Sequence, residues 1–222
     1  MPSSQDPDYA LLFRNNQRWV DRTNSNKPGF FQSLAQQQAP KYFWVGCSDS
    51  RVPANEVIDL APGEVFVHRN VANVVPHSDL NALSTLQFAV DVLRVEHILV
   101  VGHYGCGGIK AVLDNARVGL ADNWLGHVGD VMERHLTLLD SLPDAQTRHD
   151  RLCELNALEQ AHNICRSTVL QDAWARNQRL TVHACVYGLK DGLLHDLGFN
   201  VREPHTVIAH YAHALDGLRQ AG

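Results

Sequence analysis

Four short apolar runs, separated by segments of helical periodicity, are the feature that most constrains the fold of this 222-residue chain. The runs are strand-sized and rich in β-formers, and they comprise residues 42–45, 65–67, 97–101 and 180–187. Strands that alternate with helices predict right-handed crossovers. The pattern therefore indicates an α/β fold with a mainly parallel central β-sheet flanked by helices.

The helical segments are defined by apolar residues spaced three and four apart. One such stripe is predicted to begin at a cap formed by Ser78 or Asp79 and contains Leu83, Leu86, Val90 and Leu93. A second stripe runs from Leu152 to Val169, and a third helix is expected over 206–219, after Pro204. Three cysteines in these apolar patterns are expected in the core, namely Cys153, Cys165 and Cys185.

Composition excludes several classes of protein. A formal net charge of −5 argues against a nucleic-acid binder, which needs a basic face. No apolar run approaches the roughly 20 residues that cross a bilayer, and the polar N-terminus lacks the basic and apolar regions of a signal peptide. Five cysteines, an odd number, favour a reducing compartment. The chain is therefore predicted to be cytoplasmic, without nucleic-acid or membrane partners.

The chain is predicted to contain one α/β domain, over 36–222, behind an N-terminal helical arm, over 1–35. No repeat, low-complexity tract or Pro/Gly/Ser-rich linker divides it further. The arm carries Leu11, Leu12, Trp19 and Val20, which is more apolar surface than a free tail exposes.

A metal site is predicted where two of the strands end. Cys47 follows the first strand, and His103 and Cys106 follow the third in the glycine-rich segment 102–108. Binding sites of parallel sheets collect at the carboxyl ends of their strands, and thiolate and imidazole are ligands that zinc prefers. Each residue taken singly is also typical of a core cysteine or a loop histidine, so the pattern alone leaves both interpretations open. Alternation along an extended segment would also put Asp49 and Arg51 on the same side as Cys47.

Two segments decide between these interpretations. Residues 47–51 (CSDSR) and 103–108 (HYGCGG) resemble the two signatures of the β-class carbonic anhydrases, and the similarity extends from about residue 29 to residue 196. The resemblance implies a sheet of about four parallel strands plus an edge strand, a Zn²⁺ ion on Cys47, His103 and Cys106, and a homodimer or homotetramer. It also implies reversible hydration of carbon dioxide to bicarbonate by attack of zinc-bound hydroxide, with Asp49 and Arg51 as a catalytic dyad.

The resemblance further implies regulation of the kind found in a bacterial subgroup of the family. There, Asp49 would ligate zinc at low pH and release it as the pH rises. Three residues match a non-catalytic bicarbonate site that favours the closed state, namely Trp44, Arg69 and Tyr187. Asn55 is a departure, because relatives often carry an acidic residue there, and whether Glu56 replaces it is left open. Two thiolates cancel the charge of Zn²⁺, so activity is expected to rise toward alkaline pH.

By the same resemblance, an apolar pocket for carbon dioxide is lined by Phe66, Val71 and Phe88. The amide of Gly107 or Gly108 would supply hydrogen bonds, as would Gln38 from a neighbouring subunit. Phe88 replaces the tyrosine of many relatives. Two alternative functions are a hydrolase of carbon disulfide or carbonyl sulfide and a non-catalytic bicarbonate sensor. The intact Asp49 and Arg51 argue against the sensor.

Overall fold

The computed structural model describes residues 6–36 and 38–220, and the chain divides into two compact units, Met1–Gln38 and Ala39–Gly222. The first unit contains helices α1 (Pro7–Asn26) and α2 (Phe30–Gln36). The side chain of Asp6 caps α1 by accepting the backbone N–H groups of Asp8 and Tyr9. No residue of either helix is buried.

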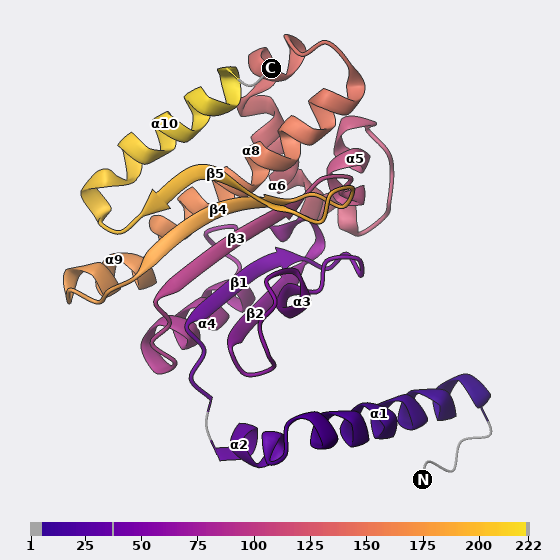
Figure 1. The fold of residues 1–222 in the computed structure, drawn as a ribbon. Helices are drawn as coiled ribbons and strands as arrows, with labels where there is room; N and C mark the ends of the chain where they lie inside the picture. Colours follow the sequence, from indigo (N-terminus) through magenta and orange to yellow (C-terminus); the bar gives the residue numbers. More distant parts are fainter. Residues whose placement is uncertain (1–5, 37, 221–222) are drawn as a thin grey trace. The chain divides into compact units, whose positions relative to one another are not determined.

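The second unit is built on a five-stranded sheet of order β2-β1-β3-β4-β5 (Figure 1). The strands are β1 (Tyr42–Cys47), β2 (Val65–Asn70), β3 (His97–His103), β4 (Thr181–Tyr187) and β5 (Leu194–Val201). The pairs β1–β2, β1–β3 and β3–β4 are parallel, and β5 is antiparallel to β4. The predicted fold class is therefore confirmed, edge strand included.

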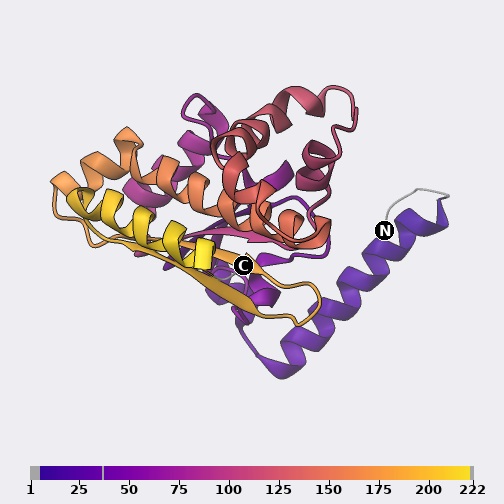
Figure 2. The ribbon, with the colours of Figure 1, turned by 90° about the horizontal axis from the view of Figure 1, so that it is seen from above.

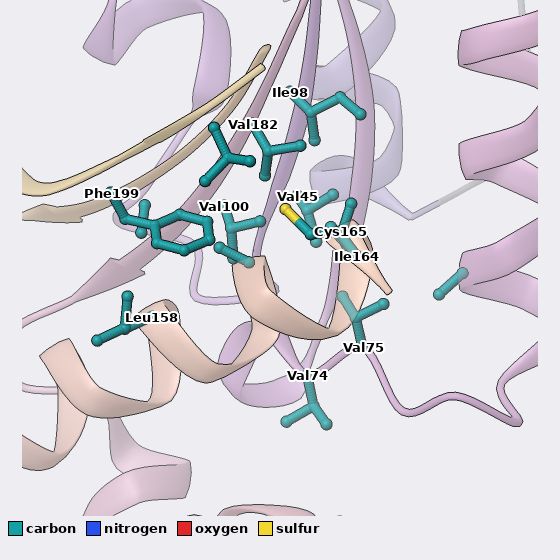
Figure 3. Packing of buried hydrophobic residues seen from close by; sticks show 14 of the residues in the cluster. Val45, Val74, Val75, Ile98, Val100, Leu158, Ile164, Cys165, Val182 and Phe199 are labelled. Carbon is teal, nitrogen blue, oxygen red and sulfur yellow. The ribbon is translucent and has the colours of Figure 1, made fainter. Parts of the chain in front are cut away.

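One face of the sheet carries the main core. Alternate strand residues, among them Val45, Ile98, Val100, Val182 and Phe199, join one large apolar cluster with the helices (Figure 3). The central helix α8 (Ala145–Cys165) packs on β3 and β4, and α10 (Val207–Gln220) packs on β5 and on α8 (Figure 2). The remaining α-helices are α3 (Ala54–Val57), α4 (Leu80–Gln87), α5 (Gly107–Leu113), α6 (Ala121–Arg134), α7 (Leu136–Asp140) and α9 (Thr168–Ala175). Three short helical turns complete the unit, namely η1 (Val71–Asn73), the π-helical η2 (Phe88–Val92) and η3 (Pro204–Thr206).

The opposite face carries a smaller apolar cluster. It contains Trp44, Val101 and Cys185 from the strands and Ala54 from α3. Because successive strand residues point to opposite faces, Trp44 and Cys47 lie on different sides of β1.

The structure refines one helical prediction and corrects another. Asp79, not Ser78, caps α4, and the stripe then continues through the π-helical turn η2. The stripe from Leu152 to Val169 is two helices, because the side chain of Ser167 accepts the N–H of Leu170 and starts α9. Among the described residues, no helix is both long and apolar enough to cross a membrane.

Candidate metal centre

The carboxyl ends of β1 and β3 bring three ligand-type side chains together. Cys47 is the last residue of β1, His103 is the last residue of β3, and Cys106 is the residue before α5. All three are buried, and one ligand atom from each lies within 4.8 Å of the others. The described part of the chain contains no other His, Cys, Asp or Glu group of this kind.

The geometry of this trio fits a tetrahedral metal ion. Zinc bonds of about 2.0–2.3 Å place ligand atoms about 3.3–3.8 Å apart, so only a small contraction is needed. The Nδ1 atom of His103 lies 3.0 Å from the carbonyl oxygen of Tyr104, which holds the proton on Nδ1. The opposite nitrogen, Nε2, is buried and has no hydrogen-bond partner. A buried polar atom without a partner is costly unless something binds it, and a metal ion would.

The two thiols compete for one proton. A hydrogen bond from the Cys106 thiol lowers the pKa of Cys47 to about 4 although burial opposes this. The same bond to Cys47, together with burial, raises the pKa of Cys106. Cys47 and Cys106 therefore carry negative charge at a buried position. A bound cation would compensate that charge.

Asp49 and Arg51 form an ion pair beside the trio. Arg51 Nε and Nη2 donate to the two Asp49 oxygens at 2.9 and 2.7 Å, and this bidentate contact holds the pKa of Asp49 below its usual range. Asp49 Oδ2 lies 3.7 Å from His103 Nε2. The expected strand alternation is wrong, because β1 ends at Cys47 and a turn follows in which the Asp49 side chain accepts the Arg51 N–H at 2.9 Å. The two side chains are therefore brought together by a side chain–backbone hydrogen bond in a turn, and not by the alternation of an extended strand.

The residues predicted to line the carbon dioxide pocket are apolar and incompletely buried. The rings of Phe66 and Phe88 are stacked with centroids 5.8 Å apart. Phe88 and Val71 keep 44% and 43% of their surface exposed in the single chain. Gly108 packs so closely on Val71 that an added Cβ would lie 3.2 Å from Val71 Cγ1. Gly107 has open space around it. Gln38 belongs to the first unit and is exposed, so its place in a pocket stays a prediction.

The three residues predicted to bind bicarbonate surround the other face of β1. Trp44 is fully buried, and its Nε1 atom has no hydrogen-bond partner. Tyr187 packs on the same apolar cluster. Arg69 donates to the backbone carbonyls of Cys47, at 2.7 Å, and of Asp49.

The open question about Asn55 and Glu56 has a structural answer. Asn55 donates to the carbonyls of Leu60 and Ala61 at 3.3 and 3.0 Å. Neither Glu56 nor any other described carboxylate forms an ion pair with Arg69. The arginine is therefore held by backbone oxygens instead.

Sequence reasoning missed several residues that support the trio. The buried His149 places Nε2 3.1 Å from the carbonyl oxygen of Cys106. On the same helix, Asn156, Gln160 and Asn163 hydrogen-bond the loop after β2. Polar residues at positions i, i+4 and i+7 within an apolar helix are a signal that could have found the last three, whereas no local pattern indicates His149.

Comparison with known proteins agrees with this geometry. A family model described as carbonic anhydrase matches residues 42–194. A carbonic anhydrase of Emericella nidulans is 45% identical over 192 residues, which are 86% of this chain and 84% of the relative. The β-carbonic anhydrase of Coccomyxa, solved in complex with acetazolamide, has a TM-score of 0.87 and 36% identity, covering 96% of this chain and 98% of its own. A tetrameric β-carbonic anhydrase from Sordaria macrospora has a TM-score of 0.84 and 33% identity, covering 88% and 100%.

Proposed function

The chain belongs to the β-class carbonic anhydrases, a family of zinc enzymes, and from this premise we propose that Cys47, His103 and Cys106 hold the zinc. The observation that carries the proposal is the buried trio with its unpartnered His103 Nε2. Bound there, zinc would lower the pKa of a coordinated water and so supply hydroxide for the hydration of carbon dioxide. A site with three protein ligands leaves the fourth position free for that chemistry.

Asp49 is the residue that orients the reacting oxygen. Its carboxylate stays ionised beside Arg51 and is only 16% exposed, so one of its oxygens can accept a hydrogen bond from a water in the site. A fixed acceptor leaves the lone pair of that water directed at carbon dioxide. Arg51 therefore acts by holding both oxygens of Asp49.

The substrate pocket of this proposal is apolar. Carbon dioxide has no dipole, so the stacked rings of Phe66 and Phe88 and the side chain of Val71 suit it. The amide of Gly107 or Gly108 supplies a hydrogen bond to the bicarbonate oxygen. Gln38 of a neighbouring subunit completes the pocket.

The pH switch of the bacterial subgroup is part of the same proposal. The short distance from Asp49 Oδ2 to His103 Nε2 supports it, because a small rotation would bring the carboxylate to a metal on that nitrogen. Arg51 would keep one partner, since its Nη2 atom also donates to the Gly105 carbonyl at 3.3 Å. Asp49 would then close the site at low pH and return to Arg51 as the pH rises.

Bicarbonate would stabilise the closed state at Trp44, Arg69 and Tyr187. The unpartnered Nε1 of Trp44 supports this, because it is a buried donor in need of an acceptor. Arg69 bonds the carbonyl of Asp49 itself, so an anion that draws Arg69 away would release the turn that carries the switch. No carboxylate competes with the anion for Arg69 among the described ion pairs.

The protein is a homo-oligomer in this proposal, with residues 1–35 as the dimerisation arm and 36–222 as the catalytic domain. Exposed aromatic and aliphatic residues of α1 support the arm, and the exposed Phe88 and Val71 support a pocket completed by a partner. A location in the cytoplasm is also proposed, on the cysteine content of the sequence.

Stopped-flow hydration of carbon dioxide by zinc-loaded protein at pH 7 and pH 9 tests the function. We expect strong activity at pH 9 and little at pH 7. Similar activity at both values would keep the enzyme and remove the switch. Zinc-loaded protein that is inactive at both would overturn the proposal, and assays with carbon disulfide and carbonyl sulfide would then test the hydrolase.

A further inference from the structure

The loop of residues 71–75, which follows β2, touches the metal centre in two ways. Its Ala72 N–H group points at the sulfur of Cys47, with N and Sγ 3.4 Å apart. Its first residue, Val71, lines the proposed substrate pocket. The conformation of this loop therefore bears both on a zinc ligand and on the space for carbon dioxide.

The loop adopts this conformation against its own backbone preference. Ala72 and Asn73 have φ angles of 63° and 48°, in the left-handed region, although neither is glycine. Both are buried, so water cannot satisfy their backbone groups. Such a conformation persists only where surrounding groups hold it in place.

The amide side chains of α8 hold it. Asn156 Nδ2 donates to the carbonyl of Ala72 at 2.8 Å. Gln160 Oε1 accepts the N–H of Val75 at 2.8 Å, and Gln160 Nε2 donates to Asn156 Oδ1 at 3.0 Å. Asn163 donates to the Val75 carbonyl at 3.2 Å. Figure 3 shows Val75 close to Ile164 of α8.

Groups outside α8 complete the restraint. Asn70 both accepts from and donates to the backbone of Val74, at 2.8 and 2.7 Å. The indole of Trp124 donates to the Val71 carbonyl at 2.8 Å. Asn156 and Gln160 differ from these because they are almost fully buried, at 0% and 2% exposed. Burying two amide side chains is costly unless their hydrogen bonds are made. We therefore expect their main contribution to be the conformation of the loop that they bond.

We propose that Asn156 and Gln160 are positioning residues of the metal centre, holding loop 71–75 so that Ala72 N–H faces Cys47 and Val71 borders the substrate pocket. This inference rests on the proposed function, because it takes Cys47 as a zinc ligand. Outer-shell groups that orient a ligand commonly change metal affinity or activity when they are removed. Here Asn156 and Gln160 act on the site through the backbone of loop 71–75. They lie on α8, a helix that supplies none of the three ligands.

Matched variants of α8 test the inference. Gln160→Met keeps the size and removes the acceptor of Val75 N–H, whereas Gln160→Glu keeps an acceptor oxygen. Asn156→Leu removes the donor to the Ala72 carbonyl. It provides a second test of the inference if Gln160→Met does not fold. Leu158→Ala is the control, because Leu158 is equally buried on the same helix and packs in the main core but has no side-chain group that could hydrogen-bond the loop.

Three readouts separate positioning from general destabilisation. We expect Gln160→Met and Asn156→Leu to release zinc to a chromogenic chelator about 10–100-fold faster than the original protein. Hydrogen exchange of the metal-free proteins is expected to rise at residues 71–75 in these variants. The KM for carbon dioxide is expected to rise as well. Gln160→Glu keeps the acceptor of the Val75 N–H but loses the donor to Asn156, so it should release zinc more slowly than Gln160→Met and faster than the original protein.

The outcomes distinguish the two proposals. If Leu158→Ala releases zinc as fast as Gln160→Met at equal loss of stability, the positioning role is wrong. Unchanged exchange at residues 71–75 in both amide variants would also overturn it. If the original protein binds no zinc while the exchange result holds, the proposed metal centre fails instead and the loop restraint stands as a structural feature.

Discussion

At the scale of single residues, the Asp49–Arg51 pair illustrates how a solvent-exposed contact can matter to chemistry. The Arg51 side chain is 57% exposed, so its pair with Asp49 adds little to stability. In the proposed mechanism, its value lies in the orientation of the Asp49 carboxylate next to the trio.

Replacing Arg51 therefore separates activity from stability. Arg51→Gln is expected to lower kcat/KM for carbon dioxide about 10²-fold, because Asp49 loses its fixed orientation. The melting temperature should change little. Arg117→Gln is the control, since it breaks an exposed pair with Asp122, 2.8 Å long, that includes none of the proposed site residues. Equal activity of both variants would remove Arg51 from the mechanism.

A second residue, Glu159, links stability to pH. It is 2% exposed, and burial alone would raise its pKa. Hydrogen bonds from His135, at 2.9 Å, and from Tyr211 outweigh burial and lower the pKa of Glu159 below its ordinary value of 4.5. A carboxyl with a lowered pKa in the folded state stabilises the fold above its unfolded pKa, and this contribution is lost as the pH falls through the folded pKa.

Glu159→Gln tests that link. At pH 7 it is expected to lower the free energy of unfolding by about 1–3 kcal/mol, because hydrogen bonds to a charged group are lost. The difference from the original protein should shrink below about pH 4.3, where the unfolded carboxyl is protonated. Urea unfolding of both proteins at pH 7, 5 and 4 measures this difference in the free energy of unfolding. A difference that is constant over this range would contradict the ionised Glu159.

At the scale of elements, the start of α5 shows why two adjacent glycines differ. A Cβ on Gly108 would lie 3.0 Å from Leu125 and 3.2 Å from Val71, whereas Gly107 has nothing within 4 Å. The helix and loop 71–75 can approach each other only because residue 108 has no side chain.

Gly108→Ala is therefore expected to destabilise the fold by about 1–3 kcal/mol through overpacking, and to raise the KM for carbon dioxide by shifting Val71. Gly107→Ala, on the same helix, should be neutral or stabilising by up to about 1 kcal/mol. Chemical unfolding measures the free energy of unfolding of both variants and of the original protein. Similar losses of stability would show that helix geometry, and not contact with the loop, decides the effect.

At the scale of the whole molecule, the exposed apolar residues of α1 are suited to a partner surface. Tyr9, Leu12 and Phe13 share one side of the helix and remain 47%, 61% and 45% exposed. No residue of α1 is buried within the single chain. An apolar helix face of this kind is typical of an interface.

Leu12→Glu is expected to weaken self-association by about 2 kcal/mol, the free energy of burying a leucine side chain. Sedimentation velocity over a dilution series measures the shift. Arg14→Gln makes the same change in net charge on the opposite side of α1 and should leave the oligomer intact. If both variants assemble like the original protein, α1 is not the interface.

Much of this architecture could be predicted from local patterns. The four parallel strands followed from apolar runs, and the segments after residues 45 and 101 were predicted to meet because parallel strands end at one edge. The turn that joins Asp49 to Arg51 could not be predicted from alternation, because the strand ends at Cys47 and side chain–backbone bonding takes over. The break between α8 and α9 depended on a single hydroxyl, that of Ser167.

By itself, the sequence determined four of the five strands, because periodicity is a local property. Its two signature segments, and not ligand chemistry alone, selected Cys47, His103 and Cys106. Only the tertiary structure decided how those residues are supported. Asn156 meets Ala72 across 84 positions of sequence, and His149 meets Cys106 across 43. Such contacts arise from the packing of α8 on β3 and β4, where buried backbone groups must find partners whatever their distance along the chain.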